Sequence, residues 1–288
     1  FTEIRKAVPS IKIDYYAKDY TLQGVWVTHF VPSNPPSQDS IWAQQPSMPF
    51  PPNSTVIIED PSMVEARIAN SEVFLSLGRF GNTFSYKLGG GYMFSDEPLV
   101  TSVTALDSST RVISQGYERY GFVGGSFNTT LGSVVLRGEA ALALDKPLNS
   151  VDTTNNPPIC IEHHHQMQTL VGVDWNMLGS QWSTQYLLTY THDHNDTLVS
   201  QLKPIKEFAH TFTFRVQDTF FDERLTAKLF GYVELEPLNA LIRPSVSYNY
   251  GNGVVLEAGL ELFLGDSEGT FGTYGDNSMA WMALRWYF

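Results

Sequence analysis

Residues 279–288 constrain the fold of this chain more than any other stretch. Apolar side chains recur there at every second residue, which is the period of a β-strand with two different faces. One face carries Ala280, Met282, Leu284, Trp286 and Phe288, and the other carries Trp281, Ala283, Arg285 and Tyr287. A terminal Phe288 after such a strand is typical of bacterial outer-membrane barrels, where it is the signal that the barrel assembly machinery reads. The alternative is a core strand of a soluble β-protein.

The composition favours the membrane protein over the soluble one. Aromatic residues make up 13% of the 288 residues and charged residues only 17%, against roughly 25% charged in an average soluble domain. The sequence has no apolar run of the roughly 18 residues that a membrane helix needs. Strands that are apolar on one face only would account for both observations.

Charge and cysteine content exclude several functions. The formal net charge of -12 argues against nucleic-acid binding and against docking on anionic lipid. The single cysteine, Cys160, rules out an internal disulfide and a cysteine-based metal cluster.

The strand runs are joined by two kinds of connection, which alternate with one exception at residues 236–239. Tight turns are expected at residues 17–19, 80–82, 129–133, 178–180, 221–223 and 251–253, and long polar loops at 31–63, 95–109, 146–162 and 265–276. Long loops outside the cell and short turns in the periplasm are the architecture of an outer-membrane barrel. We therefore predict an all-β fold, a transmembrane antiparallel up-and-down β-barrel in the bacterial outer membrane.

The strand count predicts an incomplete barrel. We count thirteen strand runs in residues 1–288, whereas bacterial single-chain barrels have an even number of strands. We expect one barrel domain over residues 1–288 that lacks at least one N-terminal strand, which gives 14 or more strands in total. The alternative is that the count has split or missed one strand.

Residues 31–63 form the longest predicted connection. The pairs Pro35-Pro36 and Pro51-Pro52 interrupt any regular strand ladder there. Loops of this length are usually functional or disordered. We expect a long extracellular loop, or one folded into the pore as a constriction or lid.

Several short stretches are shared with one protein family. They are residues 69–73, 135–141, 170–174 and 185–186, and most clearly 243–248, 262–267, 271–274 and 276–277. In these stretches the chain resembles a family of outer-membrane proteins catalogued as domain of unknown function number 1302. The resemblance implies a porin-like barrel associated with export pumps and periplasmic lipoproteins, and passage of lipid-like or hydrocarbon compounds. It implies no catalytic residues.

Charged residues fall on the strand faces that we expect to point inward. The predicted pore-lining residues are Lys87, Arg137, Glu139, Arg215, Lys228, Arg243, Glu257, Glu261 and Arg285. They would either filter solutes by their electrostatic field or pair into structural ladders across the lumen.

Histidines gather near the outer end of one predicted hairpin. His163 and His165 begin one strand, and His192 and His194 follow the strand that returns. Imidazole suits Zn²⁺, Cu²⁺ and Ni²⁺, so these four residues are candidate ligands for a divalent metal at the outer rim. The alternative is that polar aromatic residues simply accumulate at the rim. We expect no other cofactor.

The sequence predicts transport rather than catalysis. Ser200, His192 and Asp193 could form a nucleophile and base on paper, but no spacing singles them out, so we do not expect an enzyme. We expect a channel for passive passage of small or hydrophobic solutes, surrounded by outer-membrane lipid. The alternative is a structural barrel that sheathes or anchors a partner, such as an electron-transfer protein or a periplasmic or export component.

Overall fold

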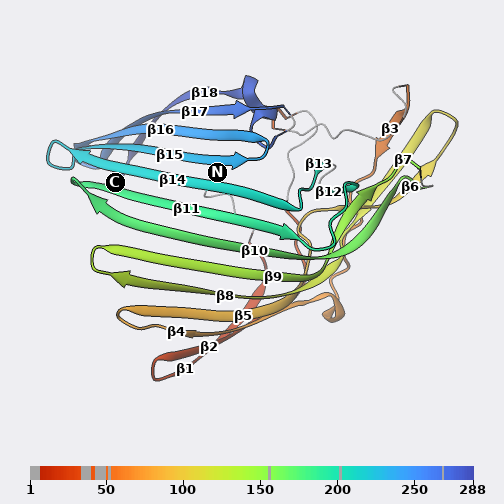
Figure 1. Ribbon diagram of the computed structural model, residues 1–288, viewed down its shortest axis with the longest axis horizontal. Coiled ribbons are helices and arrows are strands. Elements are labelled where there is room, and N and C mark those ends of the chain that lie inside the picture. Colours follow the sequence, from red (N-terminus) through yellow and green to blue (C-terminus); the bar gives the residue numbers. More distant parts are fainter. Residues whose placement is uncertain are drawn as a thin grey trace.

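The computed structural model describes residues 7–33, 40–42, 50, 53–154, 157–200, 203–267 and 269–288, and it is nearly all β. Its main element is one antiparallel sheet of 15 strands (Figure 1). Without β12 and β13, the remaining thirteen strands follow a single path. In order along the sheet they are β1 (Ser10–Ala17), β2 (Tyr20–Val27), β4 (Glu72–Arg79), β5 (Phe84–Phe94), β8 (Arg119–Leu131), β9 (Val134–Val151), β10 (Ile159–Met177), β11 (Ser180–Thr191), β14 (Phe208–Phe220), β15 (Leu225–Leu235), β16 (Leu238–Gly251), β17 (Val254–Gly265) and β18 (Met279–Trp286).

The all-β fold and the path of thirteen strands confirm the predictions from the alternation. Within the described residues, β1 pairs only with β2 and β18 only with β17, so the sheet has two unpaired edges. The predicted closure into a barrel is not seen in these residues. No helix in the described ranges is long and apolar enough to cross a membrane.

Tight turns join the strands at one end of the sheet, on the left in Figure 1. Several of their residues have positive φ, among them Lys18, Gly132, Gly179 and Asn252. Glycine and asparagine adopt this conformation at little cost, which lets two-residue turns match the twist of the strands. The turn end of the sheet is therefore built as the sequence predicts.

The opposite end is more structured than the sequence predicts. A second, three-stranded sheet contains β3 (Thr55–Ile58), β7 (Thr110–Gly116) and β6 (Leu99–Ala105), and short strands β12 (Leu198–Ser200) and β13 (Lys203–Pro204) extend the main sheet beside β9. Two short 3₁₀ helices, η1 (Ile68–Asn70) and η2 (Gly272–Asn277), complete the described elements.

Three predictions about this end were wrong. The predicted loops 31–63 and 95–109 contain β3 and β6, and most of the loop 146–162 continues β9 and β10. Between the predicted loop 95–109 and the predicted turn 129–133, the chain forms two strands, β7 and β8. These segments pack on one another, so their backbone forms strands although their sequences lack regular alternation.

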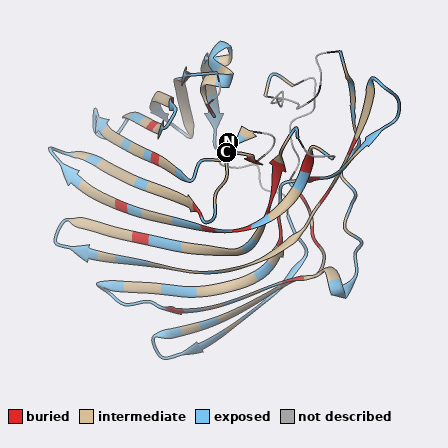
Figure 2. Cartoon of the chain, turned by 45° about the vertical axis from the view of Figure 1, so that its right-hand side comes forward, coloured by how far each residue is buried: buried red, intermediate tan, exposed pale blue. Residues whose placement is uncertain are grey.

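A small apolar core explains this packing. Val100, Ile113 and Ile159 are buried together where the second sheet meets β10, and buried positions gather at this end (Figure 2). The buried Asn149 side chain from β9 bonds both backbone groups of Val100, each at 2.9 Å. The Asn149 amide thus pairs with the edge of β6 as the backbone of a neighbouring strand would.

We predict that Asn149→Ala will loosen the second sheet from the main one. The substitution leaves the buried N–H and C=O of Val100 without partners, at about 1–3 kcal/mol for each group. Limited proteolysis should cut residues 99–116 much faster in this variant than in the wild type. Ser102→Ala, on an exposed part of the same strand, is the control, and equal cleavage of both variants would contradict the role of Asn149.

Candidate functional site

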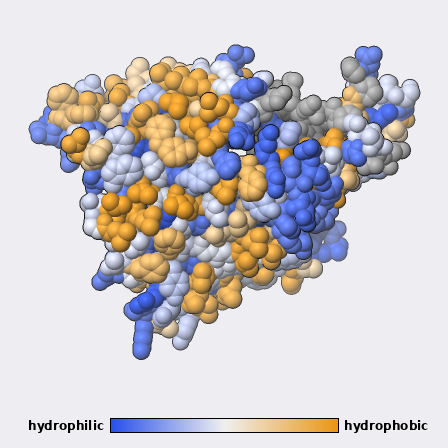
Figure 3. Space-filling view, in the orientation of Figure 1, coloured by the Kyte–Doolittle hydropathy of each residue, from blue (hydrophilic) through white to orange (hydrophobic). Residues whose placement is uncertain are grey.

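The two faces of the main sheet differ in chemistry. Opposed residues of an antiparallel pair point to the same side, so the register assigns every strand residue to one face. One face carries most of the exposed large apolar side chains, including Leu75, Val123, Val171, Val246 and Leu284. Figure 3 shows apolar side chains gathered over the strands. We call this the apolar face, and the opposite side the polar face.

All nine charged residues predicted to share a face do so. Lys87 lies opposite Ser126, and Ser126 lies opposite Glu139 on the next strand. Likewise, Arg215 lies opposite Phe230, and Phe230 lies opposite Arg243. The alternation along each strand then adds Arg137, Lys228, Glu257, Glu261 and Arg285. The polar face is therefore a continuous surface from β5 to β18.

Most of the arginines on the polar face are paired. Arg243 Nη2 lies 2.7 Å from Glu261 Oε1, and Arg285 Nη2 lies 3.0 Å from Glu257 Oε2. Arg137 forms an ion pair with Asp174. Arg215 donates a hydrogen bond of 2.8 Å to Gln217. Cross-strand ion pairs thus hold Arg137, Arg243 and Arg285.

Lys87, Glu139 and Lys228 differ from the arginines. All three side chains are exposed, and none has an ion-pair partner among the described residues. Lys87 donates one hydrogen bond of 3.2 Å to the neutral Gln23. Among the nine predicted pore-lining residues, these three and Arg215, whose partner Gln217 is neutral, carry the charge that no ion pair matches.

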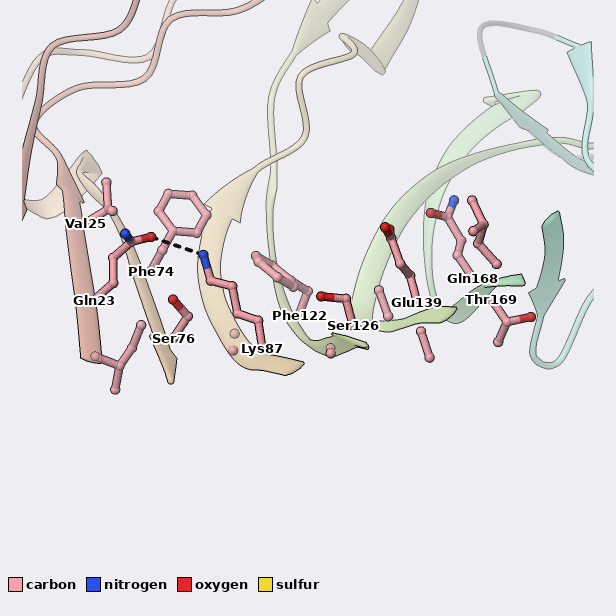
Figure 4. Close-up of a pocket in the computed structure, with 18 of the residues that line it drawn as sticks. Gln23, Val25, Phe74, Ser76, Lys87, Phe122, Ser126, Glu139, Gln168 and Thr169 are labelled. Atoms are coloured by element: carbon pink, nitrogen blue, oxygen red, sulfur yellow. Dashed lines mark hydrogen bonds between the residues drawn. The ribbon is translucent and has the colours of Figure 1, made fainter. Parts of the chain in front are cut away.

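A hollow of about 410 Å³ lies on the polar face over β2, β4, β5 and β8–β11. Lys87 and Glu139 line it together with Phe74, Phe122 and Gln168 (Figure 4). Its floor is formed by small residues, which are Ser76, Gly89, Gly124 and Ala141. A site this size can hold a small molecule.

Part of the long segment 31–63 reaches the opposite edge region of the sheet. The ring of Trp42 lies 5.6 Å from the rings of both Phe263 on β17 and Tyr274 on η2. Tyr274 Oη donates to Trp42 O at 3.2 Å, and Asn277 Nδ2 donates to Ile41 O at 2.7 Å. Phe263 is on the polar face, since it lies opposite Leu241, two residues from Arg243. Ile41 and Trp42 of this segment thus dock at β17 and η2. Residues 34–39, 43–49, 51 and 52, with the pairs Pro35-Pro36 and Pro51-Pro52, lie outside the described residues.

The four predicted metal ligands do not meet at one point. His165 and His192 stack, with ring centroids 6.4 Å apart. His163 instead lies 3.1 Å from Glu118, and His194 Nε2 lies 2.8 Å from Ile205 O. Within the described chain, no three His, Cys, Asp or Glu side chains are grouped to hold a metal ion.

The local backbone explains this correction. Adjacent side chains on a strand point to opposite faces, and a register shift between His164 and Gln166 turns the strand further. Each histidine therefore finds its own partner. The Ser200 hydroxyl donates to Glu97 at 2.9 Å.

His164, which the sequence does not distinguish from its neighbours, occupies the most enclosed position of the group. It is 8% exposed, and its two ring nitrogens lie 3.0 Å from His192 O and 3.2 Å from Glu162 Oε2. The Ser150 hydroxyl first, and then His164 and Asn195, lower the pKa of Glu162 below its ordinary value despite partial burial. The cluster fastens residues 192–197 to β10.

We predict that acid loosens this cluster. A lowered pKa means that the Glu162 carboxylate stabilises the fold fully above its ordinary pKa of 4.5, and that this contribution is lost as the pH falls through the lower folded value. Hydrogen exchange of residues 192–197 should accelerate between pH 5 and pH 3 relative to the rest of the rim. In the Glu162→Gln variant, hydrogen exchange of residues 192–197 should be fast at both pH values. A pH response equal to that of the wild type would refute the role of the Glu162 carboxylate.

We also predict that Arg243→Met destabilises the sheet by about 1–3 kcal/mol, because it leaves the Glu261 carboxylate without a partner and with little access to water. The Glu261 side chain is only 11% exposed. The double variant Arg243→Met with Glu261→Met should recover most of the loss in urea unfolding. Lys228→Met, which breaks no pair, is the control, and a loss equal to that of Arg243→Met would contradict the account.

Comparisons with known proteins identify no family. No protein-family model matches the chain, and no curated protein matches its sequence. The resemblance to domain of unknown function number 1302 therefore stays a prediction, and the function is argued from the two faces of the sheet.

Proposed function

We propose that the chain forms a β-barrel in the bacterial outer membrane and serves as a passive channel for small or hydrophobic solutes. The observation that carries this proposal is the distribution of side chains over the sheet. A soluble sheet protein packs its apolar face into a core and leaves its polar face in water. Here the polar face is concave at the hollow, and the apolar face is exposed.

The exposed apolar side chains are too large and too many for a surface in water. On β18, Met282, Leu284 and Trp286 are 72%, 69% and 70% exposed. Contact with lipid would remove such surfaces from water, at about 25 cal/mol for each Å². The lipid of the outer membrane is the partner that fits this face.

Aromatic side chains near the turn end support the same orientation. Trp175 and Trp182 stack with ring centroids 6.0 Å apart, beside the tight turn between β10 and β11. Trp175 follows Asp174, which is on the polar face, so Trp175 and its opposite residue Trp182 lie on the apolar face. Tryptophan at this position suits the interface between lipid and water.

The direction of the two edge strands decides how the sheet could close into a barrel. Every neighbour along the path is antiparallel, so the first and last of thirteen strands, β1 and β18, run in the same direction. They could pair directly only as parallel strands. An odd number of further strands would continue the antiparallel pattern across both edges and leave no unpaired backbone in the lipid.

The docked part of segment 31–63 is the best candidate for a constriction. Trp42 lies on the polar face at the loop end of β17, whereas its chain connection is to β2 near the other edge. In a closed barrel this path would cross the mouth of the lumen. Trp42 is the contact that would hold it there.

A structural barrel remains the second candidate, and the paired arginines favour it. Ladders such as Arg243–Glu261 strengthen a wall but leave little free charge for selecting ions. Such a barrel would sheath or anchor a periplasmic or export partner on its polar face. It would not conduct without that partner.

Conductance of the full-length protein in a planar bilayer separates the two candidates. We expect steady single-channel steps, and larger steps for Trp42→Ala, because its loss frees segment 31–63 from β17. Trp175→Ala, a tryptophan at the opposite end and on the opposite face, should conduct like the wild type. A barrel that stays closed in all three forms would reject the channel in favour of the structural role.

A further inference from the structure

The hollow on the polar face combines two unmatched charges with an apolar surface. Arg137, Arg243 and Arg285 each meet a carboxylate, whereas Lys87 and Glu139 have no partner of opposite charge in the described chain. We propose that this hollow is a binding subsite for short zwitterionic peptides that carry an apolar side chain. This inference rests on the proposed channel, and it names the class of solute.

Lys87 supplies the cationic end of the subsite. Its Nζ donates to the neutral Gln23 Oε1, and an ammonium group has three donors, so two remain for a ligand. Asp14, which shares Gln23 as a neighbour with Lys87, is already engaged, because it pairs with Lys12 at 3.2 Å and accepts from Gln23 at 2.8 Å. A peptide carboxylate would therefore complete the bonding of Lys87.

Glu139 supplies the anionic end at a suitable distance. It lies on β9 and Lys87 on β5, with Ser126 of β8 between them. Neighbouring strands are about 4.8 Å apart, which puts the two backbones roughly 10 Å from each other. The Lys87 side chain points away from Glu139, toward Gln23 on β2, so its Nζ lies farther from the Glu139 carboxylate than the spacing of the two backbones. An extended dipeptide of about 7 Å, with a hydrogen bond of about 2.8 Å at each end, spans roughly 13 Å.

The apolar part of the subsite comes from two phenylalanines that lie over one glycine. The rings of Phe74 and Phe122 are 6.0 Å apart between centroids. A Cβ atom added to Gly91 would lie 2.5 Å from Phe74 Cδ1 and 3.0 Å from Phe122 Cε1, so both rings rest against that glycine. Leu170 and Leu187 line the far side of the hollow. An apolar peptide side chain would pack against these rings.

Other classes of solute fit this arrangement less well. A pure hydrocarbon would cover Lys87 and Glu139 without replacing their bonds to water, and burying an unpaired charge is costly. A simple anion would satisfy Lys87 but meet the negative charge of Glu139. Only a ligand with both charges and an apolar group uses the whole hollow.

Equilibrium binding to the full-length protein in detergent tests the subsite, with phenylalanyl-alanine as the probe. We expect binding to weaken about tenfold or more when the dipeptide is N-acetylated or C-amidated, which is the worth of one charge-assisted hydrogen bond. The Lys87→Gln variant should bind the unmodified and the C-amidated dipeptide with equal affinity. The Glu139→Gln variant should bind the unmodified and the N-acetylated dipeptide with equal affinity. Lys228→Gln is the matched control and should retain the discrimination.

Uptake into liposomes separates this inference from the channel. The proposal predicts that phenylalanyl-alanine enters faster than glycyl-glutamate, and that Lys87→Gln removes the difference while ion conductance persists. Conductance with no dipeptide discrimination would overturn the subsite and leave the channel standing. Discriminating binding by a barrel that never conducts would support the subsite and reject the channel.

Discussion

The structure depends on one constraint, the strict alternation of side chains across a sheet whose two faces meet opposite surroundings. A shift of one residue in any strand would exchange its faces. In β18 such a shift would put Arg285 among the apolar side chains and Leu284 beside Glu257. The contrast between the polar and the apolar face thus fixes the register along the sheet. The tight turns at one end maintain that register from one strand to the next.

This constraint also explains the charges on the polar face. Arginines opposite or near acids on neighbouring strands, as in Arg285 and Glu257, satisfy one another and tie strands together. The hollow interrupts this pattern, because glycine and alanine at its floor leave space where a ladder could otherwise continue. Space and unmatched charge occur in the same place, which is why we assign ligand binding there.

The sequence predicted the main sheet well, because alternation is a local signal that survives in each strand. It also predicted that nine charged residues share one face, as the register shows. It did not predict β3 and β6, whose strand form depends on a distant core around Ile113 and on Asn149. The histidine site failed for a related reason. Closeness in sequence cannot show that Glu118, Ile205 and a register shift draw the four imidazoles apart.

The central claim is that the apolar face meets lipid while the polar face meets water. Spin labels on single cysteines at residues 73–77 of β4, in a Cys160→Ser background, test it most directly. In reconstituted protein, labels at Val73, Leu75 and Leu77 should be accessible to oxygen, and those at Phe74 and Ser76 to a water-soluble nickel chelate. Uniform accessibility to the chelate along the strand would contradict the account.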